Sequence, residues 1–578
     1  MTCREAEPKA FCLKWQEKRR DRAGINLEEE GILHMDLVKT DVLVIGGGIA
    51  GCFAALRASE LGRDVLIMEK ASLRRGGAVG PGMDHINMGI WPKGMLTLDY
   101  AKKKAALSKK DLLDPNVVLA VDKGAYARIQ DLERFGVPVR EDDGSYRVWE
   151  IPERRYSFVS YRGRDTKVKL AEAVRKTNTT IVERTMAVDL LVHEGRAAGA
   201  VGLNVRDGHL TAFLANATIV CTGDSGRQYL EPDGLFLTYE PITNTGDAQA
   251  IGYRSGAKLA NMEYIYMDYV SVRAGGGIAG IKPFEKMGIL VNRKGEKVLQ
   301  DEKDSVQRAF LMVKEIAEGR GPLYWDFRHL PEEVLAAYER EMEHEYPITK
   351  EWFKQKGLDL RKDLIPVQLV PAAITGGLLI DETFTTSLEG LYAAGSSCVY
   401  LLGLAQAAVS GHIAGESAAS YVAHSGDLRP DEGQISEIEK HVQGYAGRKK
   451  GIDPISLEEA VRSISTDYVG YFKEEWMMRH GLEKLLELRE QYLSRLVARN
   501  PHELMRCLEV RNIFDMIEMH IRASLMRTET RLRKNGLWPH YRIDYPELDP
   551  EWEKLVVIQK KGEEMGLSTH EIPDLKED

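Results

Sequence analysis

The chain has 578 residues, which is long enough for two to four domains with sizeable hydrophobic cores. Its formal net charge of −9 argues against a nucleic-acid-binding protein. Its hydrophobic content of 43% includes no apolar run of about eighteen residues that could span a membrane.

Residues 1–38 are charged and lack the apolar segment of a signal peptide. We therefore expect an N-terminal extension on a cytoplasmic protein. The next residues predict a strand–helix–strand unit. Val42–Ile45 and Val65–Met68 are short apolar runs that are typical of parallel strands buried on both faces. Ile49–Leu61, rich in Ala and Leu, predicts the helix between them, and Gly62 ends it.

The turn after the first strand indicates what this unit binds. Gly46, Gly48 and Gly51 have the spacing G-x-G-x-x-G, which allows a tight turn, close approach to a pyrophosphate and close packing of the helix. Glu69 ends the second strand, where a carboxylate can bind a ribose hydroxyl. We expect a dinucleotide site, with a purely structural loop as the alternative. Its place near the N-terminus, followed by more glycines, favours FAD over NAD.

A second glycine-rich loop covers Ser72–Asn87. Such bare backbone lets a flat cofactor approach closely, although an ordinary surface loop is the alternative. A second G-x-G-x-x-G occurs at Gly275, Gly277 and Gly280, but Pro283 would break the helix that a nucleotide site needs, so we interpret it as a loop.

The remaining pattern alternates strands with helices and ends in helices. The segments for which the pattern predicts regular structure are a helix at Leu113–Phe135, strands at Val182–Val192, Ala198–Asn204, Ala217–Asp224, Leu378–Asp381 and Gly390–Gly395, a small-residue helix at Ala405–Tyr421, and helices beyond about residue 426.

The order of these motifs resembles the fumarate reductase/succinate dehydrogenase flavoprotein superfamily, and within it the alpha subunits of dissimilatory adenylylsulfate reductases. The segments that carry the resemblance, besides the first glycine motif, are Gly77–Asn87, Thr222–Asp224, Asn244–Ala248, Ala257–Glu263, Glu318–Asp326, Gly390–Gly395, Arg527–Arg531 and Tyr541–Pro546.

This resemblance implies an α/β fold in which a Rossmann-like FAD-binding domain is interrupted by a capping domain and followed by a C-terminal helical domain. The expected boundaries are 1–38 for the extension, 39–263 and 366–425 for the FAD-binding domain, 264–365 for the capping domain, 426–537 for the helical domain and 538–578 for a tail.

The resemblance also implies cofactor contacts beyond the first glycine motif and Glu69. They are Lys70, Gly77, Ala78, Thr222, Gly223, Asp247, Gly395 and Ala405. Relatives that tether FAD use a histidine in the loop after the ribose acid. Residues 72–79 contain no histidine, so we expect non-covalent FAD.

For catalysis, Asn87 matches an active-site asparagine of the sulfur branch. Asp84 and His85 lie beside it and could deliver a proton, with a structural role as the equal alternative for His85. Arg273 suits an anion clamp. Three later arginines fit either an anion site or a solvated basic face: Arg527, Arg531 and Arg542.

Two segments depart from the superfamily. Ala372–Gly377 stands where relatives carry a substrate histidine, and Ala373 or a neighbour takes its place. Leu401–Ala407 replaces the family stretch Asn-Arg-Leu-Gly-Gly-Asn-Ser. Neither fumarate nor adenylylsulfate is therefore implied as the substrate.

The six cysteines are scattered without a C-x-x-C pair, so we expect no metal or iron–sulfur site in this chain. The expected function is an FAD-dependent reductase or dehydrogenase for a small anionic substrate, exchanging electrons with a ferredoxin-like iron–sulfur subunit. Four aromatic residues of the tail are expected to face that subunit: Trp538, Tyr541, Tyr545 and Trp552. The alternatives are an electron-transfer flavoprotein subunit without its own substrate and an oxidase resembling L-aspartate oxidase.

Overall fold

The computed structural model describes most of the chain. The described residues are 35–88, 97–151, 156–230, 241–271, 276–277, 287–299, 308–345, 347–399, 403–426, 431–533 and 538–576. No helix within these ranges is long and apolar enough to cross a membrane.

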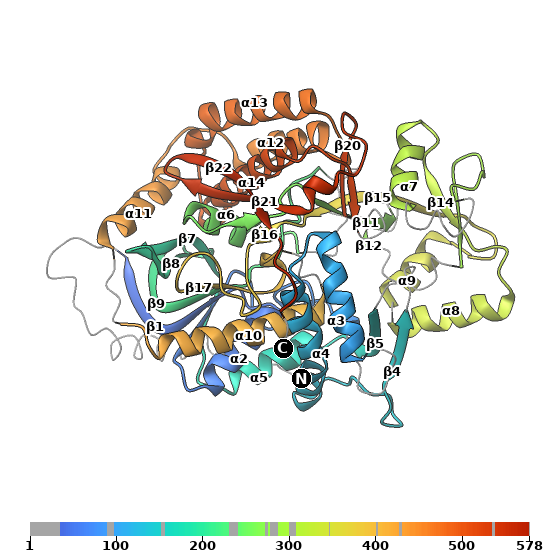
Figure 1. Ribbon diagram of the computed structural model, residues 1–578, viewed down its shortest axis with the longest axis horizontal. Helices are drawn as coiled ribbons and strands as arrows, with labels where there is room; N and C mark the ends of the chain where they lie inside the picture. Colours follow the sequence, from blue (N-terminus) through green and yellow to red (C-terminus); the bar gives the residue numbers. More distant parts are fainter. Residues whose placement is uncertain are drawn as a thin grey trace, which may run out of the picture.

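A sheet of seven strands forms the centre of the described part (Figure 1). Its order is β6-β2-β1-β9-β8-β7, with β17 also paired to β9. Neighbouring strands pair in parallel from β6 through β2 and β1 to β9, and β17 also pairs in parallel with β9. β8 pairs antiparallel with β9, and β7 pairs antiparallel with β8. The bounds are β1 Asp36–Ile45, β2 Val65–Glu69, β6 Thr180–Glu183, β7 Thr185–His193, β8 Arg196–Asn204, β9 Leu210–Val220 and β17 Leu391–Ala393.

Helices cover both faces of this sheet, which explains the buried apolar runs in its central strands. Every residue of β2 is buried. One face carries α2 (Ile49–Glu60), α5 (Thr166–Arg175) and α10 (Leu404–Val422), and the other carries α6 (Asp247–Arg254) with the C-terminal helices (Figure 1). A Cβ on Gly411 of α10 would lie 2.1 Å from the Ala50 carbonyl oxygen of α2, so these two helices touch through small residues.

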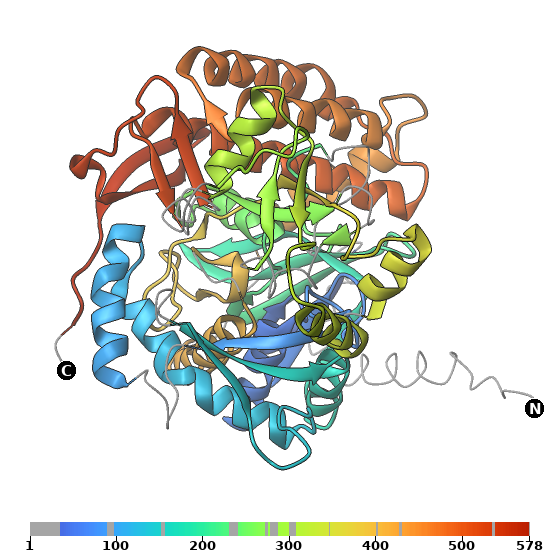
Figure 2. The same ribbon diagram turned by 90° about the vertical axis from the view of Figure 1, so that its right-hand side faces the viewer.

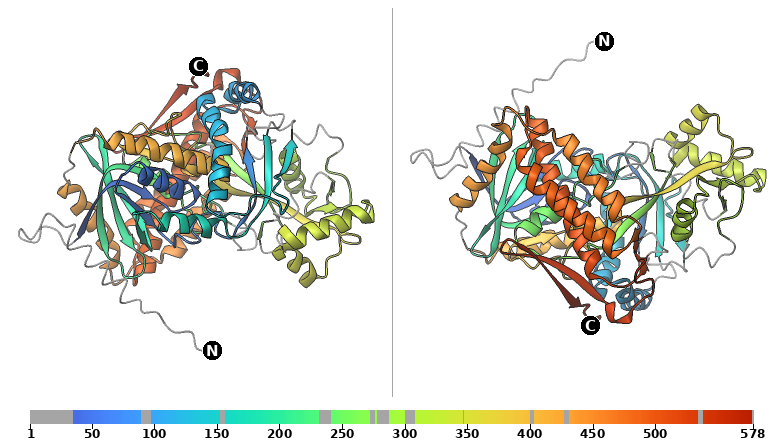
Figure 3. Two further views of the ribbon diagram at one scale, coloured as in Figure 1. Left: turned by 90° about the horizontal axis from the view of Figure 1, so that it is seen from below. Right: turned by 90° about the horizontal axis from the view of Figure 1, so that it is seen from above.

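Two smaller sheets lie beyond one end of the central sheet. The first has the order β3-β5-β4 and adjoins α3 and α4. The second, β12-β11-β15-β14-β13, carries α7, α8 and α9 and forms the cap, which projects from the rest (Figure 3). The bounds are β3 Met83–Met88, β4 Arg147–Ile151, β5 Tyr156–Gly163, α3 Leu98–Leu107, α4 Pro115–Arg134, β11 Ile265–Ser271, β12 Gly276–Gly277, β13 Ile289–Val291, β14 Leu323–Asp326, β15 Ile365–Ile374, α7 Arg308–Ala317, α8 Glu332–Glu345 and α9 Pro347–Lys356.

The C-terminal part begins with four helices and ends in strands. The longest helix is α14, in which Ile513, Ile517 and Ile521 are fully buried. The bounds are α11 Glu432–Ala446, α12 Pro454–Tyr468, β18 Phe472–Lys473, α13 Glu475–Tyr492, α14 Pro501–Met526, β19 Arg531–Arg533, β20 Trp538–Arg542, β21 Lys554–Lys561 and β22 Glu564–Glu571.

The segment expected as a C-terminal tail, 538–578, contains strands that pair with earlier parts of the chain. β21 pairs with β10 (Leu259–Ala260), which in turn pairs with β16 (Gly377–Leu378), so the last strands extend a sheet begun by earlier parts of the chain. The residues after β22 run along α3 and α4, where Asn116 Nδ2 donates to the Asp574 carbonyl oxygen at 3.0 Å (Figure 2). Trp538 is only 5% exposed, so this ring faces the protein interior instead of a partner.

Most predicted elements occur close to their expected places. The helix expected at 113–135 is α4, which begins after Asp114 because that side chain caps the Asn116 N–H. The strand expected at 182–192 is instead two strands, divided at Arg184, whose φ of 60° interrupts the extended backbone. Within the second glycine motif, Gly277 lies in β12, whereas Gly275 and Gly280 fall outside the described residues.

A buried ion network joins the central sheet to the C-terminal helices. Lys70, next to the end of β2, donates to Asp247 at 3.0 Å and to Glu509 of α14 at 2.8 Å. The other oxygen of Glu509 accepts from Arg227 at 2.9 Å, and Arg227 also pairs with Glu458 of α12. Burial alone would raise the pKa of Glu509, but Lys70 and Arg227 outweigh it and lower the pKa to about 2.

Replacing the shared carboxylate should therefore weaken the whole fold. Glu509→Gln leaves two buried cations short of charge, and we expect it to lower the free energy of unfolding by about 3 kcal/mol at pH 7. The control is Glu483→Gln on α13, whose side chain is 78% exposed and which should change stability little. Urea unfolding followed by circular dichroism measures both.

The pH dependence of that difference gives a second check. The folded-state pKa of Glu509 is lowered, so its charge stabilises the fold above the unfolded pKa of 4.5 and loses this effect as the pH falls towards 2. The gap between wild type and Glu509→Gln should thus be constant above about pH 5 and narrow below it. A gap that grows on acidification would contradict the assignment.

Candidate functional site

The first glycine turn has three positions with different structural demands. Gly46 has φ +100°, and a Cβ there would lie 2.4 Å from the Cys221 carbonyl oxygen. A Cβ on Gly51 would lie 1.9 Å from the Gly46 carbonyl oxygen. Around a Cβ on Gly48, by contrast, the nearest atom is the Gly77 Cα at 3.9 Å. The protein itself therefore requires Gly46 and Gly51, whereas Gly48 leaves its backbone open to a ligand.

Glu69 links the two glycine loops. Its Oε2 accepts from the Gly47 N–H at 2.6 Å, and its Oε1 accepts from the Ala71 N–H at 2.7 Å. The side chain is buried, with 6% exposure. A carboxylate has about four acceptor positions, so these two bonds leave capacity for a ribose hydroxyl.

The second glycine loop lies directly against the first. Gly77 has φ +83°, and a Cβ there would lie 3.0 Å from the Gly48 Cα. Ala78 beside it is exposed. Two stretches of bare backbone therefore lie against each other at the ends of β1 and β2, and such backbone lets a flat cofactor approach closely.

The neighbouring strands bring further predicted residues to the same edge. Thr222 and Gly223 follow β9, and Gly395 follows β17, so their backbones lie beside the Gly46 turn because β1, β9 and β17 are adjacent and parallel. The Gly395 N–H donates to Ser410 Oγ of α10 at 2.9 Å, near the buried Ala405 at the start of that helix. In open α/β sheets, ligands bind at the carboxyl ends of the strands.

Lys70 and Asp247 lie at this edge but engage each other. Besides its ion pairs, Lys70 donates to the Thr243 carbonyl oxygen at 2.9 Å. Burial alone would lower the pKa of Lys70, but Asp247 and Glu509 outweigh it and raise it. Asp247 Oδ1 accepts from Thr245 and from Asn512 at 2.8 Å. Both residues thus support the site by fixing α6 beside Thr222, whose Oγ1 accepts from the Ala248 N–H.

The candidate catalytic residues are only partly placed. His85 and Asn87 lie in β3, paired with Ser160 and Phe158 of β5, and Asp84 lies at an irregularity of that pairing. His85 is half-buried. Arg273 lies outside the described residues.

Small side chains occupy the segment in which the family resemblance implies a substrate histidine. Ala372 and Ala373 of β15 pack against Tyr266 and Trp538. The two rings are 6.4 Å apart and nearly perpendicular. The buried Arg533 has its guanidinium carbon 4.5 Å from the Tyr264 ring centroid and 5.3 Å from that of Trp538. The two alanines therefore pack against two aromatic rings, and Arg533 lies against one of these rings, that of Trp538.

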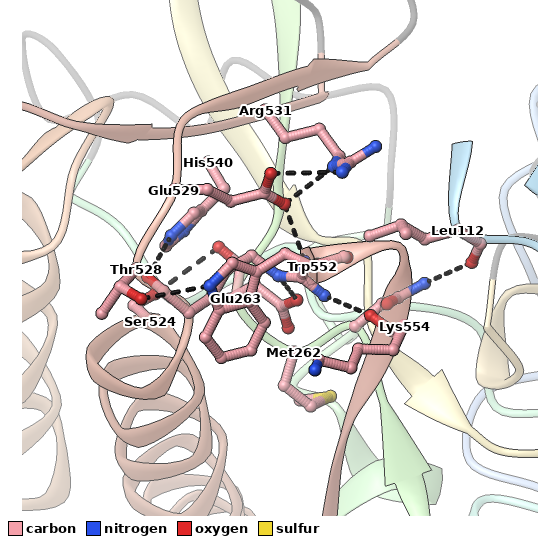
Figure 4. Close-up of polar contacts among 12 residues, drawn as sticks. Leu112, Met262, Glu263, Ser524, Thr528, Glu529, Arg531, His540, Trp552 and Lys554 are labelled. Carbon is pink, nitrogen blue, oxygen red and sulfur yellow. Dashed lines mark hydrogen bonds and ion pairs between the residues drawn. The ribbon is translucent and has the colours of Figure 1, made fainter. Parts of the chain in front are cut away.

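The three late arginines are buried, so both readings of them, an anion site and a solvated basic face, are wrong. Arg527 donates to Glu263 at 2.6 Å, to Glu529 at 2.8 Å and to the carbonyl oxygens of Trp552 and Lys554, and these four partners are labelled in Figure 4. Arg531 pairs with the same Glu529. Arg542 pairs with Asp544. Each of the three guanidinium groups therefore has a carboxylate partner within the protein, and Arg527 joins the C-terminal strands to Glu263.

Lys473 and Asp224 are among the buried ionisable groups that the sequence pattern did not single out. Lys473 donates to the Glu263 carbonyl oxygen at 2.6 Å and to Ser524 at 3.1 Å, and burial lowers its pKa to about 7. Asp224 follows Gly223 at the carboxyl end of β9 and is 3% exposed. An acid directly after the Thr-Gly that ends a buried strand was the available signal for Asp224, whereas nothing in the pattern around Lys473 marked it.

Comparisons with known proteins agree with this architecture. The family described as FAD binding domain matches residues 41–408, and the family described as fumarate reductase flavoprotein C-term matches residues 458–574. An uncharacterized FAD-dependent oxidoreductase of Methanocaldococcus jannaschii is 30% identical over 556 residues, covering 91% of this chain and 97% of the relative.

Two further similarities are more distant. One of the subunits of the fumarate reductase (CoM/CoB) of Methanothermobacter marburgensis is 26% identical, over 92% of this chain and 99% of its own. The adenylylsulfate reductase of Archaeoglobus fulgidus has the same fold, with a TM-score of 0.82 at 23% identity over 94% of this chain and 97% of its own. The chain belongs to the fumarate reductase/succinate dehydrogenase flavoprotein family and is an FAD-dependent oxidoreductase of that type.

Proposed function

We propose that this chain is the FAD-carrying subunit of a larger oxidoreductase and that it transfers two electrons between a small anionic substrate and a separate iron–sulfur protein. The main support for this proposal is a contact between the cap strand β15 and the segment that follows the carboxyl end of β9. Ser225, two residues after Gly223, forms a bridge with Ile374 of β15, and Ser225 Oγ donates to the Ile374 carbonyl oxygen at 3.3 Å. Substrate bound under the cap would thus lie beside the cofactor edge.

The residues at this edge fit an FAD. Gly48 and Gly77 present bare backbone at this edge, and a side chain at Gly48 would occupy part of the open space beside it. Buried oxygen atoms of Asp224 and Gln249 have no hydrogen-bond partner within the described part of the chain, and a bound molecule with hydroxyl or N–H groups would supply one. Bound FAD would supply the two-electron chemistry, and the protein would supply position and charge.

The substrate would differ from that of the fumarate reductases among the relatives. An anionic substrate remains suitable, because Arg533 and Arg273 would provide cationic groups for a charge like that of the dianion fumarate. Ala372 and Ala373, packed on Trp538, replace the histidine that the resemblance implies in this region. We therefore infer an anionic substrate that does not need a histidine proton donor there.

The electron partner is inferred from two observations. Several relatives are named as subunits, including those of fumarate reductases, so such flavoproteins belong to assemblies. The cysteines of this chain are scattered, and the four in the described residues, which are Cys52, Cys221, Cys398 and Cys507, are all buried. A separate protein would therefore carry the iron–sulfur centres.

Turnover of substrate by the isolated chain tests the proposal directly. The flavin is reduced with light under anaerobic conditions, and unsaturated dicarboxylates and sulfur oxyanions are added one at a time. We expect one class to restore the oxidised absorbance within seconds. If every compound leaves the flavin reduced, the chain only relays electrons. Rapid reduction by NADH or NADPH alone would argue against a protein donor.

FAD binding can be separated from folding with one pair of variants. Gly48→Val should lower flavin occupancy more than tenfold, because its side chain enters the space where the backbone approaches the pyrophosphate. Gly426→Val is the matched control, since no atom of the described residues beyond its chain neighbours lies within 4 Å of a Cβ built there. Flavin absorbance per mole of purified protein measures occupancy. A fully yellow Gly48→Val protein would refute the assignment.

Attachment of the cofactor is tested by acid precipitation. No histidine occurs in residues 72–79, and His85 lies further along, in β3. We expect all of the yellow colour in the supernatant after trichloroacetic acid. Colour that stays in the protein pellet would identify a covalent bond, and mass spectrometry of tryptic peptides would locate it.

A further inference from the structure

One acidic side chain at the cofactor edge has no charged partner in the described part of the chain. Asp224 is 3% exposed and follows Gly223, whose φ of +85° turns the chain at the end of β9. Its Oδ1 accepts one long hydrogen bond, from Asn244 Nδ2 at 3.3 Å. Its Oδ2 is buried and has no hydrogen-bond partner among the described residues. A buried carboxyl group in this state is rare unless a bound molecule completes it.

The segments around Asp224 are those that would surround the flavin. Gln249 Nε2 donates to the carbonyl oxygens of Gly223 and Ser396, which ties the turn after β9 to the turn after β17. The neighbouring Ser225 contacts Ile374 of the cap strand β15. Asp224 therefore lies where the turn after β9, the turn after β17 and the cap strand β15 meet.

The neighbouring cations Arg227 and Lys70 form ion pairs with other carboxylates. Arg227 is held by Glu458 and Glu509, and Lys70 is held by Asp247 and Glu509. Cys221 precedes Asp224 by three residues and Cys398 follows Ser396 by two, and burial raises the pKa of both thiols, so they stay neutral. No cation of the described residues forms an ion pair with Asp224.

We propose that Asp224 couples a proton to the redox state of the flavin: it takes up one proton from solvent when the flavin gains two electrons, and releases it when they leave. The proposal rests on FAD binding under the proposed function. The electrons come from the donor protein, the only bond that forms or breaks at Asp224 is its O–H bond, and the carboxylate becomes a neutral acid.

The physical reason is electrostatic. Burial raises the pKa of Asp224 to about 6, so the group titrates close to neutral pH. Added negative charge on a neighbouring group in a poorly solvated site favours the neutral acid further. The ionised form of Asp224 should therefore lower the midpoint potential of the flavin, and the protonated form should raise it.

The test is the flavin midpoint potential as a function of pH, measured on wild type and on Asp224→Asn. The two should agree at pH 5, where Asp224 is neutral. Above about pH 6, the midpoint potential of wild type should fall more steeply with pH than that of Asp224→Asn. One extra proton per two electrons adds a tenfold change in the equilibrium per pH unit, which equals about 30 mV for a two-electron couple. Asp142→Asn, whose side chain is 93% exposed, should follow wild type.

Two outcomes would overturn the proposal. One is a constant offset between wild type and Asp224→Asn across pH 5 to 8. The other is a wild-type potential without a change of slope. The wild-type curve decides the question alone if Asp224→Asn fails to fold or to hold flavin. Asp224→Glu, which keeps the acid, should retain the change of slope at a shifted pH.

Discussion

The sharing of Glu509 between Lys70 and Arg227 is the interaction on which the arrangement of the other parts depends. Lys70 follows the strand that ends in Glu69, Arg227 follows the turn after β9, and Glu509 comes from α14. Burying these charges is costly, and only complete pairing offsets the cost. The pairing therefore fixes the helical part against two of the strand ends that form the cofactor edge. A second buried cluster, centred on Arg527, fixes the last strands in the same manner (Figure 4).

The local part of the fold was predictable because its signals lie close together in the sequence. The first strand, glycine turn, helix and second strand occupy fewer than forty consecutive residues, and each has its own pattern. The C-terminal strands were not predictable in the same way. β21 pairs with β10, almost three hundred residues earlier, and neither segment carries a mark of its partner. Aromatic residues at the end of the chain therefore suggested an exposed surface, although Trp538 packs inside.

The candidate site was predictable to a similar extent. Glycines that must adopt positive φ or permit close approach leave a clear trace, so Gly46, Gly48 and Gly77 were identified together. Charged residues leave none, because a sequence does not show which charges pair. Arg527 looked like a surface or binding residue and is a fully buried structural one. The sequence marks Asp224 only as part of a motif, because its isolation from cations depends on Arg227 and Lys70 being engaged by residues far along the chain.

The position of the cap within the sequence has a consequence for how the protein is made. β17 and α10, which complete the central sheet and cover α2, lie after the cap, so a ribosome must deliver more than four hundred residues before the domain can close. Until then, the edge of β9 that β17 later pairs with is open, and the face of α2 around Ala50 lacks the glycines of α10. Nascent chains of this architecture must pass through a stage with an unpaired strand edge, which is the kind of surface that chaperones protect.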